Sequence, residues 1–262
     1  MSKDVTAIEK QDRLFVGSVK KAFLVLEAFQ SDTPDLSLNE IITRTNLNKS
    51  AAQRFTHTLQ VLGYLDKDPS SKRYSLSKKV LKSANSFLRV DTLVNRASPN
   101  IIALRRQLNM RIGVGCLNGK NAMYLIPLQS NRAAFRTAHP GFEVPVFCTS
   151  TGRALLAYQP KDIAREIIEN SKRKQYTPFT MTDVDAIMAE IELAQQNGYS
   201  ITDQELITAD INIATPIFDS KGVAVATVTA SGSKSNWSKK ELENEVAFLV
   251  METARAISTG DL

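Results

Sequence analysis

Residues 36–76 limit the fold of this chain more than any other stretch. Ser37 and, three residues later, Glu40 form the signature of a capping box, which predicts that a short helix begins there. A second helix is predicted from near Ser50 to about Gly63, since glycine commonly ends helices. Two short strand-forming runs follow, with a polar turn between them. This order of elements predicts a compact helical module with a β-ribbon wing.

A further helix is predicted before this module. Ser18 is expected to be its N-cap, and apolar residues recur behind it at helical spacing, namely Val19, Ala22, Phe23, Leu26 and Phe29. Pro34 disfavours helix at the preceding residue, so the helix should stop shortly before it. The winged helix-turn-helix domain is therefore expected to span residues 15–77.

The positive charge of the chain is concentrated in this first part. The whole chain has 33 Lys and Arg against 27 Asp and Glu, a net charge of +6. Residues 97–262 contain equal numbers of the two kinds, so the whole excess lies before residue 97. A basic surface attracts polyanions and releases counterions when it meets phosphates. The charge therefore favours DNA as the partner of the winged module.

The helix that begins near Ser50 has two different faces. One face is apolar, with Ala52, Phe55, Leu59 and Leu62. The other consists of hydrogen-bond donors: Lys49, Ser50, Gln53, Arg54 and His57. Arginine can read guanine through two hydrogen bonds, and glutamine can read adenine in the same way. We predict that this face reads base edges in double-stranded operator DNA, the alternative being an ordinary solvated face.

The predicted wing has cations near its tip: Lys67, Lys72 and Arg73. Contacts to phosphates position a protein on the duplex but carry no sequence information. We therefore assign affinity to the wing and specificity to the donor face of the preceding helix.

Residues 78–98 are expected to form a helical linker. The helical pattern continues to Leu108, with one expected interruption at 98–99. An apolar stripe on the linker favours packing against a second copy of the chain, with packing on its own domain as the alternative; the stripe consists of Val80, Leu81, Ala84, Phe87 and Leu88. A two-fold dimer would present two recognition helices to a palindromic operator.

The pattern changes to strands after Leu108. Asn118 and Gly119 separate two strand-forming runs, which predicts a hairpin. A second hairpin is predicted near the C-terminus, and the expected strands are 111–117, 122–128, 133–138, 211–218 and 223–230. Helices are expected at 151–158, 160–173, 182–197 and after Trp237. Antiparallel strands with helices between and after them indicate an α+β domain at 99–262, with helices covering the sheet.

The motifs of several enzyme classes are missing. Gly113, Gly115 and Gly119 miss the dinucleotide-binding spacing by one residue, and the last of them with Lys120 lacks the length of a P-loop. Ser150 does not lie in a nucleophile elbow. Two histidines and two distant cysteines give no zinc-binding spacing. We expect no catalytic residue, no cofactor and no metal.

Composition also bears on the location of the protein. No apolar run resembles a signal peptide or approaches the length of a membrane span, so we expect a cytoplasmic protein without a membrane partner. Cys116 and Cys148 predict reduced thiols, with a disulfide as the less favoured alternative.

Several short motifs in order resemble the IclR family of bacterial transcriptional regulators, over nearly the whole chain from Gly17. They are SVKKA at 18–22, NKS at 48–50 leading to LGYL at 62–65, STGRALLA at 150–157, GY at 198–199 followed by DQE at 203–205, and ATPIFD at 214–219. The resemblance implies an N-terminal winged helix-turn-helix and a C-terminal GAF-like effector domain. It also implies homodimers or homotetramers and small effectors, often acidic or aromatic metabolites.

The resemblance places the effector between the loop before the helix at 153–157 and the last hairpin. Hydroxyls and free N–H groups at that helix start can bind a carboxylate, although the sequence alone favours plain N-capping as their role. Ser150 and Thr151 stand where many relatives have Gly or Ala, which predicts a smaller or more polar pocket. The positions expected around the effector are Arg136, Val144, Ser150, Thr151, Asp203, Ile211, Ile213, Ser231 and Ser233.

The resulting hypothesis is a transcription factor whose operator binding is controlled by a small-molecule effector. Such control requires that the effector bind one arrangement of the oligomer more tightly than another. The alternative from another class is an enzyme acting on a small metabolite and localised by the basic module. A third reading is an architectural DNA-binding protein without a ligand.

Overall fold

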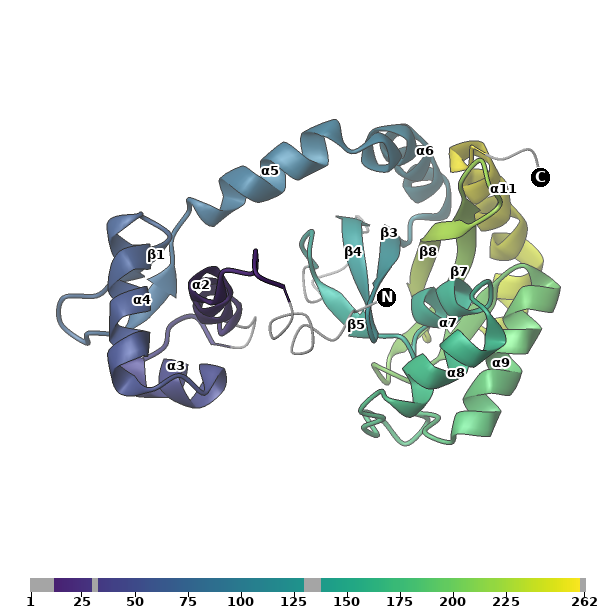
Figure 1. Cartoon of the computed structure of the whole chain (residues 1–262). Coiled ribbons are helices and arrows are strands. Elements are labelled where there is room, and N and C mark those ends of the chain that lie inside the picture. Colours follow the sequence, from purple (N-terminus) through teal and green to yellow (C-terminus); the bar gives the residue numbers. More distant parts are fainter. Residues whose placement is uncertain (1–11, 30–32, 130–137, 260–262) are drawn as a thin grey trace. The chain divides into compact units, whose positions relative to one another are not determined.

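The computed structural model describes residues 12–29, 33–129 and 138–259. The chain divides into two compact units, Met1–Val90 and Asp91–Leu262. Figure 1 shows a small helical unit with a short ribbon and a larger unit built on a sheet. The residues expected to form a separate linker, 78–98, are divided between the two units.

The first unit has the predicted order of elements. Its helices and strands are α2 (Gly17–Glu27), α3 (Leu38–Thr45), α4 (Lys49–Val61), β1 (Leu65–Lys67), β2 (Tyr74–Leu76) and α5 (Val80–Val90). The predicted capping box is present, because Ser37 and Glu40 each accept a hydrogen bond from the other's backbone N–H. The two strands of the wing pair antiparallel, with Leu65 opposite Leu76. The predicted winged helix-turn-helix fold is confirmed.

Two details of α2 differ from the prediction. Ser18 is not the N-cap, because the helix already begins at Gly17 and Val16 occupies the capping position without a side-chain bond. The buried side chains are Val25 and Ala28, which pack with residues of α3, α4 and the wing. Of the predicted stripe, Leu26 and Phe29 are partly buried against this core, whereas Val19 and Phe23 are more than half exposed.

The apolar face of α4 also differs at one position. Leu62 is 52% exposed, because it lies beyond the last helical residue. Thr56 is buried instead, and its hydroxyl donates to the carbonyl of Ala52 at 2.9 Å. A threonine can therefore occupy a core position of a helix when the backbone of the preceding turn accepts its hydrogen bond.

The expected helical interruption lies earlier than predicted. Helix α5 ends at Val90, and α6 (Thr92–Leu108) begins after Asp91, whose carboxylate accepts from the N–H of Val94 at 2.8 Å. Pro99 lies inside α6 and does not end it. The acidic N-cap thus decides the boundary, while the cost of one proline is offset by the burial of Ile101 and other residues on the same helix.

The second unit is built on a six-stranded antiparallel sheet with the order β5-β4-β3-β8-β7-β6. The strands are β3 (Arg111–Asn118), β4 (Asn121–Leu128), β5 (Glu143–Pro145), β6 (Ser200–Asp203), β7 (Asp210–Phe218) and β8 (Ala224–Ser233). Both predicted hairpins are confirmed, β3–β4 and β7–β8. The edge strands β5 and β6 were not predicted, and the expected strand at 133–138 lies, except for Ala138, outside the described residues.

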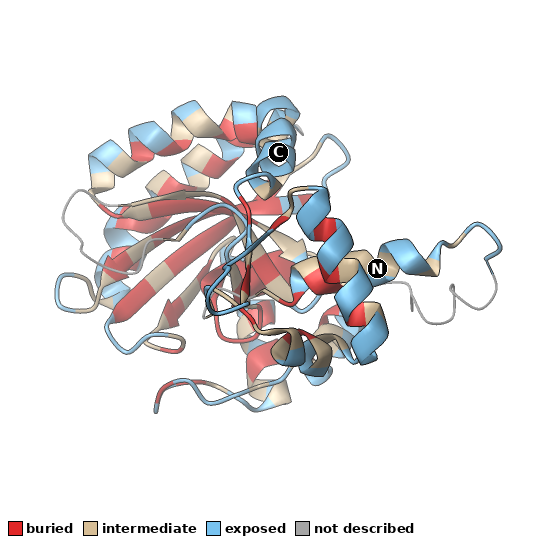
Figure 2. Cartoon of the chain, turned by 90° about the vertical axis from the view of Figure 1, so that its left-hand side faces the viewer, coloured by how far each residue is buried: buried red, intermediate tan, exposed pale blue. Residues whose placement is uncertain are grey.

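Helices cover both faces of this sheet. Helix α6 and the C-terminal helices α10 (Lys239–Glu241), η1 (Leu242–Val246) and α11 (Ala247–Ile257) pack against one face. Helix α7 (Ser150–Leu156) lies on the other face, and α8 (Lys161–Glu169) and α9 (Val184–Asn197) pack against it in a second core. Figure 2 shows buried residues along the strands and exposed residues on the outer sides of the helices. The predicted α+β architecture is confirmed.

The two cysteines are free, as predicted, and burial raises the pKa of the Cys148 thiol to about 12. In the described part of the chain, no helix has both the length and the apolar character that crossing a membrane requires.

Candidate functional site

The outer face of α4 is the first candidate site. The five hydrogen-bond donors predicted there are all exposed: Lys49, Ser50, Gln53, Arg54 and His57. Asn48 caps the helix by accepting from the N–H of Ala51 at 2.8 Å, so the donors at its start are held on an ordered turn. Ala52, Thr56 and Leu59 face the core, which leaves the donor face directed to solvent.

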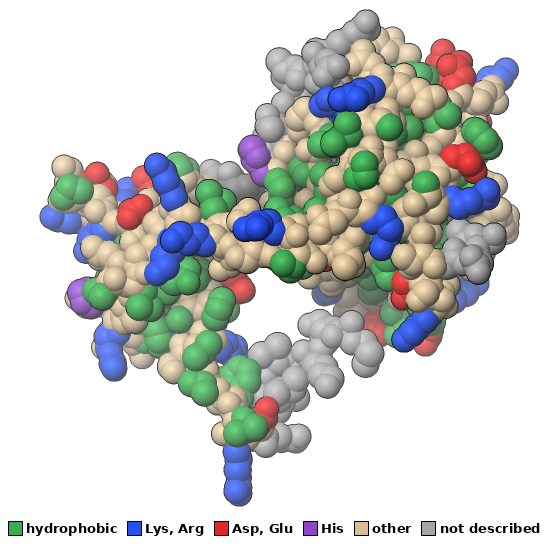
Figure 3. Space-filling view, turned by 90° about the horizontal axis from the view of Figure 1, so that it is seen from above, with side chains coloured by type: hydrophobic (Ala, Val, Ile, Leu, Met, Phe, Trp, Pro, Cys, Tyr) green, Lys and Arg blue, Asp and Glu red, His purple; other side chains and the backbone are tan. Residues whose placement is uncertain are grey.

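Asp68 organises the tight turn between the two strands of the wing. Its carboxylate accepts from the N–H groups of Ser70 and Ser71 at 3.0 and 2.6 Å, and these bonds, that to Ser71 first, lower the pKa of Asp68. Lys67 and Lys72 are exposed beside this turn. In the space-filling view, Lys and Arg side chains lie on the surface of the small unit at the left (Figure 3).

Arg73 differs from the other two cations of the wing. Its Nε donates to Asp35 Oδ1 at 2.5 Å, and its Nη2 lies 2.9 Å from Glu40 Oε2. The hydrogen bond from Arg73 to Asp35, and then the charge of Glu40, raise the pKa of the guanidinium. Arg73, which the sequence grouped with Lys67 and Lys72 near the tip of the wing, therefore ties the wing to α3 and to the segment before it.

The second candidate site is a cavity of about 770 Å³ on the α7 face of the sheet. Its floor includes three side chains that lie side by side across neighbouring strands, because Ser231 of β8 is opposite both Arg111 of β3 and Asn212 of β7. Asp210 lies next to this row, and its Oδ2 is 2.6 Å from Nη2 of Arg111. The floor thus offers a guanidinium, a carboxylate, an amide and a hydroxyl in one small area.

A chain of hydroxyls forms one wall of the cavity. The Tyr124 hydroxyl is 3.0 Å from Thr151 Oγ1, which is 2.7 Å from Thr229 Oγ1. Burial raises the pKa of Tyr124, so its phenol stays protonated and able to donate at neutral pH. The Tyr124 ring fits against Gly113, where a Cβ would come within 2.8 Å of the ring.

The remaining walls are largely apolar. They come from the end of β4, from the segment before α7 and from two loops, with Pro127, Leu128, Phe142, Tyr176, Leu206 and Ile207 among the lining residues. Phe142, Tyr176 and Ile207 each keep more than 40% of their surface exposed. A cavity with a polar floor and apolar walls suits a small amphipathic molecule whose polar end lies on the sheet.

Two family models match consecutive parts of the chain. The IclR helix-turn-helix domain matches residues 18–69, and the bacterial transcriptional regulator IclR C-terminal domain matches residues 86–259. The second match alone covers more than half of the sequence. The chain belongs to the IclR family of bacterial transcriptional regulators.

Individual relatives agree with membership of the IclR family. The chain is 29% identical over 242 residues to the Pca regulon regulatory protein of Pseudomonas putida, covering 92% of this chain and 82% of that protein. It is 28% identical over 243 residues to the HTH-type transcriptional regulator KdgR of Escherichia coli, covering 93% and 92%. The crystal structure of an IclR homolog from Microbacterium hydrocarbonoxydans, complexed with 4-hydroxybenzoate, matches with a TM-score of 0.76 at 22% identity, covering 92% and 97%.

The family and these relatives are transcriptional regulators, so the alternative of a metabolic enzyme is not supported. The helix-turn-helix of an IclR-family member binds DNA, and its C-terminal domain binds small-molecule effectors. The two candidate sites of this regulator lie in these two domains.

Four of the effector residues predicted for this IclR-family regulator line the cavity: Val144, Ser150, Thr151 and Ser231. Four others are placed elsewhere. Ile211 and Ile213 are fully buried in the core on the opposite face of the sheet. Asp203 forms an ion pair with Lys234 at 2.5 Å, and the Ser233 hydroxyl bonds to Ser235. Arg136 lies outside the described residues.

The misplaced isoleucines have a simple geometric cause. Successive side chains of a strand point to opposite faces, so a shift of one residue exchanges the two faces. Asp210 and Asn212 of β7 face the cavity, and the isoleucines between and after them face the helices. The alternation of polar and apolar residues along β7 was the available signal. The prediction also missed Arg111, Tyr124 and Thr229, which come from the β3–β4 hairpin and from β8, a strand far from that hairpin in the sequence.

Proposed function

We propose that this IclR-family regulator binds a palindromic operator as a homo-oligomer and that a small organic acid in the cavity controls this binding. The observation that supports the proposal best is the cavity floor, where the guanidinium of Arg111 lies beside hydrogen-bonding side chains. The size of the cavity, about 770 Å³, lies within the range of sites for small ligands.

The chemistry of the floor favours an acid with an additional hydroxyl. Arg111 suits a carboxylate, and Ser231 and Asn212 stand beside it as further hydrogen-bond partners. Asp210 can accept from a hydroxyl of the ligand. The apolar walls with Phe142 and Tyr176 suit a ring or a short carbon chain. The relative that was crystallised with 4-hydroxybenzoate makes hydroxylated aromatic acids the first compounds to test.

The DNA contacts are proposed for the first unit. Gln53 and Arg54 have the reach and donors for base edges, while Lys49, Ser50 and His57 surround them on the same exposed face. Lys67 and Lys72 are proposed to contact phosphates. Ser18, exposed in the first turn of α2, is proposed as a further DNA contact, whereas Arg73 is proposed to position the wing rather than to bind DNA.

Oligomer formation is proposed to involve α5. All of its residues are at least partly exposed, and Leu81, Phe87 and Val90 are among the most exposed large apolar residues of the chain. A helix that leaves such a stripe in water gains free energy when a second copy covers it. A homodimer would present two recognition helices to the two halves of a palindromic operator. A homotetramer would add further contacts between subunits.

The proposal is tested by a thermal-shift screen of the full-length protein against aromatic and aliphatic hydroxy acids. 4-Hydroxybenzamide is the matched control for 4-hydroxybenzoate, because it has the same ring and lacks the charge. Each acid that raises the melting temperature is then added to a promoter-fragment binding assay. We expect the acid to change the affinity of the protein for its operator and the amide to leave this affinity unchanged. If no acid of the panel shifts either measurement, the effector assignment is wrong.

A further inference from the structure

A buried ion pair lies behind the wall of the cavity. Arg153 of α7 is 1% exposed, and its Nη1 and Nη2 donate to the two carboxylate oxygens of Glu205 at 2.6 and 2.7 Å. Its Nε donates to the carbonyl of Phe147 at 3.0 Å. Neither Arg153 nor Glu205 is among the described residues that line the cavity.

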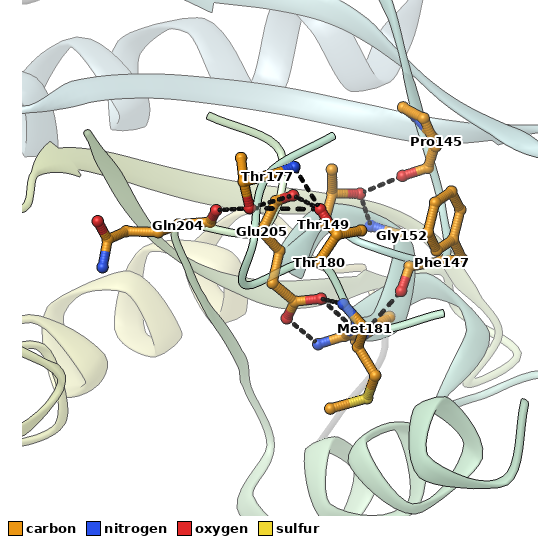
Figure 4. Close-up of polar contacts among 10 residues, drawn as sticks. Pro145, Phe147, Thr149, Gly152, Thr177, Thr180, Met181, Gln204 and Glu205 are labelled. Atoms are coloured by element: carbon orange, nitrogen blue, oxygen red, sulfur yellow. Dashed lines mark hydrogen bonds and ion pairs between the residues drawn. The ribbon is translucent and has the colours of Figure 1, made fainter. Parts of the chain in front are cut away.

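The pair is connected to two loops that do line the cavity. Glu205 Oε2 also accepts from the N–H of Met181 at 3.2 Å, and its carbonyl accepts from the Thr180 hydroxyl at 2.6 Å. The Thr177 hydroxyl donates to the carbonyl of Gln204 at 2.7 Å. Figure 4 shows these groups converging from the loop at 176–181 and from the residues after β6. One ion pair thus joins the start of α7, the loop with Tyr176 and the loop with Leu206 to Thr208.

The energetics of buried ion pairs suggest what this one is for. Removing two charges from water is costly, and apolar residues of similar volume are often as stable in the same place. Global stability is therefore a weak reason for such a pair. A bidentate pair does fix geometry, because its guanidinium fork fits only one arrangement of the carboxylate.

We propose that Arg153 and Glu205 are positioning residues for the effector: they hold the two wall loops against α7 and so set the affinity and selectivity of the cavity without contacting its occupant. The proposal rests on the proposed function, since it assumes that the cavity is the effector site. Loss of the pair should free the loops, while the sheet and the C-terminal helix keep their packing.

The test compares three variants of the full-length protein with the wild type. In Arg153→Met/Glu205→Leu the pair is replaced by apolar residues, which avoids leaving one charge buried alone. The matched control is Arg165→Gln/Asp185→Asn, which removes an exposed ion pair between α8 and α9 outside this network. Arg153→Lys keeps one charge pair but cannot reach both carboxylate oxygens and the Phe147 carbonyl together. It is the second variant should the double replacement fail to fold.

Two measurements are made, of which the first needs no ligand. Amide hydrogen exchange in 176–181 and 204–209 should be at least about tenfold faster in Arg153→Met/Glu205→Leu than in the wild type, with α11 unchanged. Calorimetry with 4-hydroxybenzoate and 3-hydroxybenzoate should show about tenfold weaker binding and a smaller preference between the isomers. Arg165→Gln/Asp185→Asn should match the wild type in hydrogen exchange and in calorimetry.

The proposal is wrong if amide hydrogen exchange in both loops is the same in Arg153→Met/Glu205→Leu as in the wild type. It is also wrong if exchange is faster in this variant but its affinity for the two hydroxybenzoates and its preference between them are those of the wild type. A wild-type protein that binds neither acid speaks against the proposed effector class, and the exchange measurement then decides alone whether the pair positions the wall.

Discussion

Arg111 and Asp210 face each other across the cavity floor, with Nη2 of the arginine 2.6 Å from Oδ2 of the aspartate. They come from β3 and β7, two strands separated by β8, and Ser231 of β8 lies opposite Arg111 in register. The cation is thus held in place by the protein before a ligand arrives. Because Arg111 is already ordered, less side-chain entropy is lost when a carboxylate ligand binds to its guanidinium.

The first prediction concerns Arg111. Hydrogen bonds to charged groups contribute about 1.5–3 kcal/mol, which corresponds to a loss of about ten- to a hundredfold in affinity. We therefore expect Arg111→Gln, combined with Asp210→Asn so that no carboxylate is left unpaired, to weaken binding of 4-hydroxybenzoate by this factor. Calorimetry is the measurement, with 4-hydroxybenzamide as the uncharged control. An equal loss for acid and amide would contradict a charge-specific role.

The second prediction concerns the fit of Tyr124 against Gly113. A Cβ added at Gly113 would lie 2.8 Å from Cε1 of the tyrosine, which is shorter than a van der Waals contact between two non-bonded carbon atoms. Gly113→Ala should therefore displace the ring. The displaced ring loses its hydrogen bond to Thr151. We expect a destabilisation of about 1–3 kcal/mol in chemical denaturation. In a Tyr124→Val background, Gly113→Ala should have almost no effect on stability, because no ring is left to displace. If the destabilisations of the two substitutions simply add, Gly113→Ala disturbs something other than the Tyr124 ring.

Local signals in the sequence predicted much of the fold but only part of the cavity. Asn118 and Gly119 marked the β3–β4 turn, and the Ser37–Glu40 pair marked the start of α3, because both depend only on neighbouring residues. The edge strand β6 is four residues long and carries no such turn signal.

The cavity depends on registers between distant strands, which no local pattern reveals. Arg111 and Asn212 are about a hundred residues apart in the sequence, yet both are neighbours of Ser231. The ion pair of Arg73 was equally hidden, since Asp35 lies in the segment before α3. Such contacts follow from the fold and not from the composition of either segment.

The third prediction separates specificity from affinity in DNA binding. Arg54→Ala should cost about 1–3 kcal/mol on the operator and relax the base preference, because a bidentate contact to a base edge is lost. Lys72→Ala should weaken binding to all duplexes alike and reduce the dependence of affinity on salt by about one counterion. Both are measured by fluorescence anisotropy on operator and scrambled DNA across a salt series. An operator affinity untouched by Arg54→Ala would falsify the assignment of α4 as the recognition helix.

The fourth prediction is a pH dependence of the first unit. Hydrogen bonds from the side chain and backbone of Ser37, and then the charge of Arg73, lower the pKa of Glu40 below its ordinary value of 4.5. A lowered folded-state pKa contributes stability that is present above the ordinary value and is lost as the pH falls through the lowered one. The melting temperature should therefore fall on acidification below about pH 4.5, and less so in Glu40→Gln, which already lacks the charge. Equal pH profiles for the two proteins would contradict this role of Glu40.

The fifth prediction concerns the apolar stripe of α5. Leu81 is 64% exposed and Phe87 49%, so a second copy that covers them removes apolar surface from water at about 25 cal/mol per Å². Leu81→Lys/Phe87→Lys should shift the protein towards monomers in light scattering after gel filtration, because the new charges would have to be desolvated in the interface. Ser86→Lys adds a charge to the same helix one turn after Lys82, away from Leu81 and Phe87, and is the control. Operator affinity should fall together with the oligomer, since a monomer presents a single recognition helix to a two-part site. Should the doubly substituted protein keep its mass and its operator affinity, the oligomer must form through another surface.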